Sequence, residues 1–282
     1  MNAPRLGPGT ARKLSVSVSL AAVIAVAVGV LERSPGSDAA ASTGGVGGAA
    51  GPVLELVAEV LSVFPHDPAA YTQGLLWHEG ALFESTGNYG RSSLRKVELT
   101  TGRVQQRVEL PGDLFGEGLA RVGDRLFQLT WREGVVLEWD LQSFEVRSRH
   151  ELVGEGWGLC YDGERLILSD GGSRLSFRRP DDFGPMGEVT VRLRGEPLPS
   201  LNELECAEGW VYANLYGSER IVRIDAQSGE VVAVIDASGL VDADLGRAGV
   251  LNGIAYNGDR KTFYLTGKNW SKLFEVVFVG AG

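Results

Sequence analysis

Histidine is scarce in this sequence, and the three histidines present, His66, His78 and His150, lack the spacing of metal ligands. No GxSxG pattern marks a nucleophilic serine. The Gly-Lys pair that ends at Lys268 is not part of a GxxxxGK[ST] phosphate-binding loop. These absences give little support to metal catalysis, serine-dependent hydrolysis or nucleotide binding.

Basic residues are also in the minority: 27 lysines and arginines stand against 36 aspartates and glutamates, for a net charge of −9. A phosphate backbone requires a basic surface, so this charge argues against a nucleic-acid-binding protein. Helical periodicity is missing beyond the N-terminal segment. Glycine is abundant, with 39 residues, many of them at turn positions. The composition therefore favours an all-β globular protein with many tight turns.

The N-terminus has the pattern of an export signal. Three basic residues precede an uncharged and mostly apolar stretch, residues 14–31. A stretch of this length could instead remain as a membrane anchor. We therefore expect a signal peptide or membrane anchor over residues 1–33, a flexible linker over 34–52 and one folded domain over 53–282. Export implies a periplasmic or secreted location.

Five stretches of the remaining chain can be aligned with one another, and successive stretches begin 40 to 50 residues apart. In each, a short apolar run precedes a turn that contains glycine, and a second apolar run follows, which is the pattern of a β-hairpin. A second hairpin follows, as in residues 94–110. The five stretches begin at Tyr71, Phe115, Glu155, Leu201 and Leu251.

Four short strands in each of five repeats predict a five-bladed β-propeller with four antiparallel strands per blade. A β-sandwich or two small β domains would not explain five aligned repeats. The last repeat supplies only a third strand, and an alternating segment, Val53 to Phe64, precedes the first repeat. We expect this segment to supply the outer strand of the last blade, which would close the ring and leave no open edge.

The two cysteines, Cys160 and Cys206, occupy equivalent positions in neighbouring repeats. Export to an oxidising compartment favours a disulfide. Equivalent positions in neighbouring blades point in the same rotational sense, however, so one thiol would face its neighbour while the other faced away. The Cα atoms would then lie beyond the limit of about 7 Å for a bridge. The sequence therefore predicts two free thiols.

Aligned positions of the repeats form rings around the predicted axis, near which propellers bind ligands. The ring at the start of the first strands contains Gln73, Glu117, Trp157, Glu203 and Asn252. The ring at the end of the second strands contains Gly87, Trp131, Gly171, Tyr216 and Lys268. A single tryptophan could pack between blades, and a single glutamate could be solvated. The divergence among repeats on both rings nevertheless indicates a site built on a repeat scaffold.

Several segments of the repeats are distinctive as a set: PHDPAAYTQGL, LFESTGNYGRSSLR, FGEGL, EGWGL, LNELE, VLNGIAY and TGKNWSKLFE. With them the chain resembles the plant and bacterial type of glutaminyl-peptide cyclotransferase from about Val57 to Phe278. The resemblance implies a five-bladed propeller whose active site lies at one end of its channel. It also implies conversion of an N-terminal glutamine into pyroglutamate with release of ammonia. Tyr216 departs from the usual tryptophan, and Ser271 departs from the usual proline.

The resemblance implies roles for individual residues. The family's catalytic carboxylate matches Glu117, its polar substrate-holding groups match Gln73, Asn202 and Lys268, and its aromatic wall matches Phe115, Trp131 and Trp157. We therefore predict catalytic roles for Glu117, Lys268 and Asn202. We predict substrate-binding roles for Gln73, Phe115, Trp131, Trp157, Glu203 and Tyr216.

The expected reaction is an attack of the α-amine of glutamine on its own γ-carbonyl, so holding the ring-closing geometry supplies much of the rate. One carboxylate facing both nitrogens can move the proton, and burial beside aromatic rings would raise the pKa of Glu117 to suit that task. Lys268 or Asn202 could stabilise the developing γ-oxyanion. The sequence leaves open which donor faces which atom.

This chemistry requires no cofactor, and the sequence leaves a structural metal open. The expected partners are peptides or proteins with N-terminal glutamine. The chain is expected to be a monomer, to bind no nucleic acid and to meet a membrane only through an uncleaved anchor. Two alternatives remain. A non-catalytic peptide-binding propeller would not turn over glutamine peptides, and a metal-dependent lactonase-like propeller would lose activity with a chelator.

Overall fold

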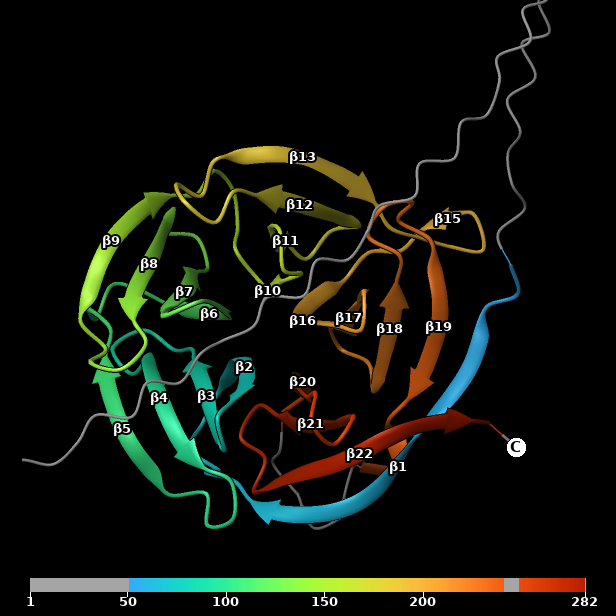
Figure 1. Ribbon diagram of the computed structural model, residues 1–282, viewed down its shortest axis with the longest axis horizontal. Coiled ribbons are helices and arrows are strands. Elements are labelled where there is room, and N and C mark those ends of the chain that lie inside the picture. Colours follow the sequence, from blue (N-terminus) through green and yellow to red (C-terminus); the bar gives the residue numbers. More distant parts are fainter. Residues whose placement is uncertain (1–50, 241–248, 282) are drawn as a thin grey trace, which may run out of the picture. The chain divides into compact units, whose positions relative to one another are not determined.

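The computed structural model describes residues 51–240 and 249–281. Apart from one 3-10 turn, η1 (Ser238–Leu240), every secondary-structure element of these residues is a β-strand. Consecutive strands form three four-stranded antiparallel sheets (Figure 1). The first contains β2 (Thr72–His78), β3 (Ala81–Thr86), β4 (Ser93–Glu98) and β5 (Val104–Glu109). The second contains β6 (Gly116–Val122), β7 (Arg125–Thr130), β8 (Val135–Asp140) and β9 (Val146–Glu151). The third contains β10 (Leu159–Tyr161), β11 (Leu166–Ser169), β12 (Arg174–Arg178) and β13 (Pro185–Thr190).

The fourth and fifth repeats are joined in one eight-stranded sheet of order β16-β17-β18-β19-β1-β22-β21-β20. Its strands are β1 (Leu54–Pro65), β16 (Leu201–Ala207), β17 (Trp210–Leu215), β18 (Arg220–Ile224), β19 (Val231–Asp236), β20 (Leu251–Asn257), β21 (Thr262–Gly267) and β22 (Lys272–Gly280). A small two-stranded sheet of β14 (Arg192–Leu193) and β15 (Glu196–Pro197) precedes β16 in the chain.

The strand β1 joins these two repeats because it pairs along both of its edges. It runs antiparallel to β22, which is the pairing expected for this segment. Its first residues also run parallel to β19, from Leu54 opposite Ala233 to Val57 opposite Asp236. The predicted five-bladed β-propeller of four-stranded antiparallel blades is therefore wrong, because two repeats share a single mixed sheet. Apolar alternation identifies an extended segment but does not reveal which strands it meets on each edge.

The first strands of the five repeats nevertheless lie next to one another. Strand β2 packs against β6 and β20, β10 packs against β6 and β16, and β16 packs against β20. Figure 1 accordingly shows these strands innermost, with β5, β9 and β13 farther out. This arrangement brings together the beginnings of the five inner strands, and six of the nine predicted site residues lie on these strand starts or within two residues before them.

The inner hairpins turn where the sequence places glycine. Four of these turn glycines, Gly80, Gly123, Gly163 and Gly209, have φ between 61° and 101°, a region that residues with a side chain rarely adopt. The fifth hairpin has a longer turn between β20 and β21. There Lys261, with φ of 55°, takes the left-handed conformation rather than Gly258.

Apolar side chains fill the spaces between neighbouring sheets. Leu94, Leu126 and Leu137, which are at most 1% exposed, belong to a cluster shared by the first and second sheets. Burial of a leucine side chain contributes roughly 1.5–3 kcal/mol. Packing of this kind fixes the inner strands relative to one another and hence fixes the side chains that they carry.

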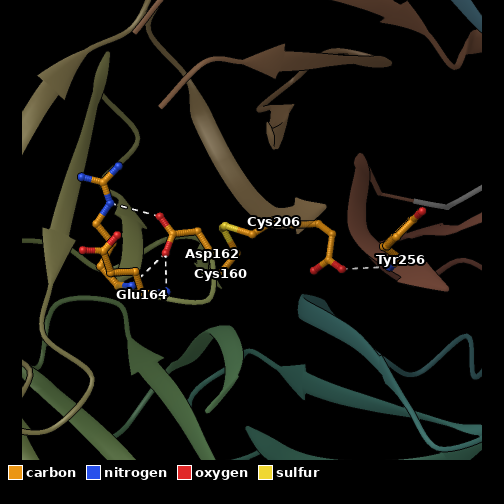
Figure 2. The surroundings of a disulfide bond; sticks show 7 residues. Cys160, Asp162, Glu164, Cys206 and Tyr256 are labelled. Atoms are coloured by element: carbon orange, nitrogen blue, oxygen red, sulfur yellow. Dashed lines mark hydrogen bonds and ion pairs between the residues drawn. A yellow bond between two sulfur atoms is a disulfide. The ribbon is translucent and has the colours of Figure 1, made fainter. Parts of the chain in front are cut away.

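Cys160 on β10 and Cys206 on β16 form a disulfide, with Cα atoms 5.4 Å apart (Figure 2). The prediction of two free thiols is therefore wrong. Strands β10 and β16 are neighbours, and they approach closely because Gly158 has no side chain: a Cβ there would collide with the backbone of Asn202. The separation is thus well within the range of a bridge, whatever the rotational sense of the repeats.

The predicted leader, residues 1–33, and the predicted linker, residues 34–52, lie outside the described residues except for Gly51 and Pro52. The first described strand begins at Leu54. Within residues 51–240 and 249–281, no helix is both long enough and apolar enough to cross a membrane.

Candidate active site

A cavity of about 200 Å³ lies where the inner strands begin. Its walls come from these strand starts and from the loops that follow the second strands, and all five repeats contribute. It is lined by Tyr71, Gln73, Asn88, Phe115, Glu117, Trp131, Trp157, Asn202, Tyr216 and Lys268. Of the predicted site residues, Glu203 alone is absent from this lining.

Irregularities in the inner strands aim side chains at the cavity. The pairing register shifts between Gly116 and Leu119 in β6 and between Leu201 and Leu204 in β16. Equivalent shifts occur in β2 and β20. A bulge bends a strand and redirects its side chains, and bulges are common next to active sites. The shifted segments contain Gln73, Glu117 and Asn202, which line the cavity, and Asn252, whose side chain donates a hydrogen bond to Gln73.

Glycines allow the inner strands to approach one another at the level of the cavity. A Cβ on Gly74 would lie 2.5 Å from the backbone N of Leu119, and a Cβ on Gly118 would lie 2.5 Å from the backbone N of Leu159. Any side chain at either position would push two inner strands apart. Gly74, next to Gln73, and Gly118, next to Glu117, therefore allow the close spacing of the inner strands around the cavity.

Glu117 is the buried carboxyl of the cavity. It is 4% exposed, and its Oε1 accepts a hydrogen bond of 2.8 Å from the side-chain amide of Gln73. Burial raises the pKa of Glu117 well above its usual value, because the ionised form loses its hydration. The positive charge of Lys268 opposes this increase, and the carboxylates of Glu133 and Glu155 add to it. Such a carboxyl can both take up and release a proton.

Lys268 brings a buried cation to the same cavity. It is 4% exposed, and its Nζ lies 4.8 Å from the ring centroid of Tyr71 and 5.3 Å from that of Tyr216. The faces of aromatic rings attract cations. Burial lowers the pKa of Lys268, and the nearby Glu117 opposes that decrease. Because Lys268 lines the cavity, its ammonium form can stabilise negative charge that develops there.

Asn202 offers an unused hydrogen-bond donor. Its side chain is 1% exposed, and its Nδ2 has no hydrogen-bond partner. Its backbone oxygen accepts a hydrogen bond of 2.6 Å from the hydroxyl of Ser169, which holds the strand start in place. Buried donors are nearly always paired, so an unpaired one in a cavity lining is available to a ligand.

The four aromatic side chains predicted to bind substrate form two contacting pairs around the cavity, and Tyr71 meets Phe115 edge-on at 6.3 Å. Phe115 and Trp131 have ring centroids 5.5 Å apart, and Trp157 meets Tyr216 edge-on at 5.5 Å. Trp131 and Tyr216 follow second strands of their repeats, whereas Phe115 and Trp157 precede first strands. Each pair therefore joins a residue just before a first strand to a residue just after a second strand, and together the four side chains form the aromatic wall of the cavity.

The glycines of the second predicted ring make room for this wall. A Cβ on Gly87 would collide with the ring of Phe115, and a Cβ on Gly171 would lie 2.7 Å from the ring of Trp157. Each glycine thus allows an aromatic ring to lie directly against the backbone at its own position. Both positions serve the site through the space that they leave free.

The chain is similar to known proteins over most of its length. The sequence profile of the glutamine cyclotransferase family matches residues 30–278. The chain belongs to this family. A relative in Arabidopsis thaliana named glutaminyl-peptide cyclotransferase is 40% identical over 224 residues, which cover 77% of this chain and 70% of the relative. The crystal structure of Myxococcus xanthus glutaminyl cyclase matches with a TM-score of 0.77 and 42% identity, covering 82% of this chain and 100% of that chain. The resemblance inferred from the motifs is confirmed.

Glu203 was predicted to contact substrate, but it does not line the cavity of this cyclotransferase-family chain. It is fully buried, and its two carboxyl oxygens accept hydrogen bonds from the backbone N of Leu75, at 3.1 Å, and of Ile254, at 2.8 Å. Leu75 lies on β2 and Ile254 on β20. Glu203 therefore connects three inner strands, and its neighbour Asn202 faces the cavity instead.

Two residues of the cavity lining, Tyr71 and Asn88, were not predicted. Tyr71 precedes β2 by one residue and lies beneath the ammonium of Lys268. Asn88 follows Gly87 and has a φ of 97°. Asn88 adjoins Gly87 and Tyr71 lies two residues before Gln73, so a search within two positions of each ring would have found them. Among the described residues, no group of three or more His, Cys, Asp or Glu side chains is placed to hold a metal ion.

Proposed function

We propose that this chain converts the N-terminal glutamine of peptides and proteins into pyroglutamate and releases ammonia. The observation that carries the proposal is the buried carboxyl of Glu117, whose pKa is raised and which lines a small cavity together with an unpaired amide donor. Similarity to the Arabidopsis glutaminyl-peptide cyclotransferase and to the Myxococcus glutaminyl cyclase supports the same activity.

The size of the cavity suits a single terminal residue. At about 200 Å³ it is smaller than the roughly 300–1,000 Å³ of pockets that hold drug-sized ligands. A glutamine side chain and its α-amine would enter, while the rest of the peptide would stay outside. Such a site would accept peptides and proteins that differ in sequence beyond the terminal glutamine.

The proposed reaction passes one proton through one carboxyl. The α-nitrogen of the glutamine attacks its own γ-carbonyl carbon and forms the C–N bond of the five-membered ring. Glu117 accepts the proton that the attacking nitrogen loses. The same carboxyl then donates that proton to the amide nitrogen as its bond to the γ-carbon breaks. Ammonia leaves, and Glu117 returns to its starting state.

The other residues of the cavity would hold the substrate and stabilise the developing charge. The free Nδ2 of Asn202 and the ammonium of Lys268 are the donors proposed for the γ-oxyanion. Gln73 would hold the carboxyl of Glu117 through its hydrogen bond. The proposed substrate-binding wall consists of Phe115, Trp131, Trp157 and Tyr216.

The proposed chemistry uses no cofactor, and we expect the chain to act as a monomer. We further propose that the protein is exported to the periplasm or secreted, where it would act on peptides and proteins with N-terminal glutamine. The disulfide between Cys160 and Cys206 supports export, because disulfides persist mainly in oxidising compartments.

Ammonia release from the dipeptide Gln-Ala tests the proposed function. The chain should produce one ammonia for each pyroglutamyl-alanine, and a chelator should leave the rate unchanged. Nα-acetyl-Gln-Ala is the matched control, because its blocked amine cannot attack. Equal release from the acetylated peptide would indicate simple amide hydrolysis, and loss of activity with chelator would favour the metal-dependent alternative. If no ammonia is released from Gln-Ala, the chain would be a peptide-binding protein without catalytic activity.

A further inference from the structure

Two tryptophans of the aromatic wall share one hydrogen-bond acceptor. Glu155 lies between β9 and β10, and its Oε2 accepts the indole N–H of Trp131 at 2.9 Å and that of Trp157 at 3.0 Å. Trp131 follows a strand of the second sheet, whereas Trp157 precedes the third sheet. Among the described residues, Glu155 is the only acceptor for either indole N–H. One carboxylate oxygen thus connects two sides of the cavity.

The other oxygen of Glu155 acts on Trp131 through a neighbouring cation. Oε1 accepts a hydrogen bond of 2.8 Å from Nε of Arg132, and the guanidinium carbon lies 3.7 Å from the ring centroid of Trp131. Hydrogen bonds from Trp157, Arg132 and Trp131 lower the pKa of Glu155, so this carboxyl stays ionised at neutral pH. The ring of Trp131 is therefore held on its face by a cation and at its edge by an anion.

A simple surface ion pair is the alternative account of these contacts. The side chains of Arg132 and Glu155 are 57% and 36% exposed, and such pairs contribute little to stability. An ion pair does not require that two indoles from different sheets converge on one oxygen. An indole has a single N–H, which lies in the plane of the ring, so the shared acceptor restricts the orientation of both planes.

We propose that Glu155 is a positioning residue, which orients Trp131 and Trp157 so that the aromatic wall can enclose an N-terminal glutamine. The proposal rests on the proposed function, which assigns this wall to substrate binding. Glu155 touches neither the reacting atoms nor Glu117. Its loss should therefore weaken substrate binding and leave the proton transfer largely intact.

The substitution Glu155→Ala tests the proposal through KM and kcat with Gln-Ala. KM should rise about tenfold or more, the usual effect of losing hydrogen bonds to a charged group, while kcat changes less than about threefold. Glu155→Gln keeps one acceptor oxygen and should give an intermediate KM. Each variant is measured at its own optimal pH, because the charge of Glu155 also acts on Glu117.

The matched control is Glu151→Gln, which removes a carboxylate from the exposed end of β9, and its KM should equal that of the wild type. A wild-type KM for Glu155→Ala in a folded protein would overturn the proposal. A loss confined to kcat would overturn it as well. If Glu155→Ala does not fold, Glu155→Gln decides by the same criteria.

Quenching of tryptophan fluorescence by acrylamide tests the positioning without any turnover. Glu155→Ala should increase the quenching, because the freed indoles become more accessible. The increase should vanish when Trp131→Phe and Trp157→Phe are both present. If the wild type released no ammonia, the proposed function would be wrong. The quenching measurement would still test the indole contacts, because it does not depend on turnover. Unchanged quenching in a folded variant overturns the proposal in either case.

Discussion

Gln73 donates a side-chain hydrogen bond of 2.8 Å to Oε1 of Glu117. The orientation of this amide is determined by Asn252, whose Nδ2 donates to the amide oxygen of Gln73 at 3.1 Å and to the backbone oxygen of Thr72 at 2.9 Å. The NH₂ group of Gln73 must therefore face Glu117. Because the donor is neutral, it holds the carboxyl in place without fixing it in the ionised state.

Glu84 shows the effect of a cationic partner on an equally buried carboxyl. It is 1% exposed and contacts Arg95, and the Nε2 of His66 lies 3.0 Å from its Oε1. Burial acts to raise the pKa of Glu84, but Arg95 and His66 outweigh it and hold that pKa well below its usual value. Burial with a neutral partner therefore yields a carboxyl able to carry a proton, whereas burial with cations yields a permanent anion.

Deletion of β1 should strongly destabilise the protein. A chain that begins at His66 would leave unpaired edges on both β19 and β22 and would expose the apolar side chains beneath β1. We expect a large decrease in the melting temperature, or aggregation, relative to a chain that begins at Val53. Equal melting temperatures of the two chains, measured by circular dichroism, would show that β1 does not hold the two repeats together.

Loss of the disulfide should destabilise the protein without changing its fold. The bridge between Cys160 and Cys206 spans a sequence separation of 46 residues. Closure of a loop of that length contributes about 4 kcal/mol in the chain-entropy account. The Cys160→Ala, Cys206→Ala double variant should lose stability of this order in urea titrations. Thiol titration of the unfolded protein should find no thiol before reduction and both after it; free thiols before reduction would contradict the bridge.

Glu205 should make the protein less stable as the pH rises. Burial raises its pKa from 4.5 to about 8, although the hydrogen bond from the backbone N of Tyr256 opposes the increase. A carboxyl with a higher pKa in the folded state binds more protons there than when unfolded. Its stabilising contribution is therefore complete below about 4.5 and is lost as the pH rises to about 8.

The substitution Glu205→Gln tests this dependence because it keeps the oxygen that accepts the hydrogen bond from Tyr256. We expect the melting temperature of the variant to match the wild type near pH 4.5 and to exceed it at pH 8 and above. Glu164→Gln, on the exposed turn between β10 and β11, is the control and should show no such divergence. A constant difference between Glu205→Gln and the wild type at every pH would contradict the assignment.

Local patterns in the sequence were sufficient to predict the hairpins of the repeats, but not the short pair β14 and β15 or all of the strand partners. Apolar alternation and turn glycines identified the hairpins, because these depend on neighbouring residues. The parallel pairing of β1 with β19 depends on segments far apart in the chain, and no local pattern reports it. The close approach of Cys160 to Cys206 likewise depends on Gly158, whose role appears only where two inner strands meet.

Prediction of the site depended on aligned positions, and it failed where the strands are irregular. Alternation along a regular strand places adjacent residues on opposite faces, but the bulge between Leu201 and Leu204 removes that regularity. The sequence therefore could not determine whether Asn202, Glu203 or both would face the cavity. Glu155 was missed because its effect on the cavity passes through two indoles rather than through direct contact.

The most direct test of the account is the turnover of Gln-Ala by Glu117→Gln, with ammonia release as the measurement. The amide keeps the size and the hydrogen-bonding reach of the side chain but cannot carry the proton. Turnover should fall roughly 10²–10⁴-fold, the usual contribution of a general acid–base group, while the melting temperature stays equal to or slightly above that of the wild type. Glu151→Gln, at the exposed end of β9 and outside the cavity lining, should retain full turnover. A folded Glu117→Gln protein that keeps more than about a tenth of wild-type turnover would contradict the account, because another group would then carry the proton.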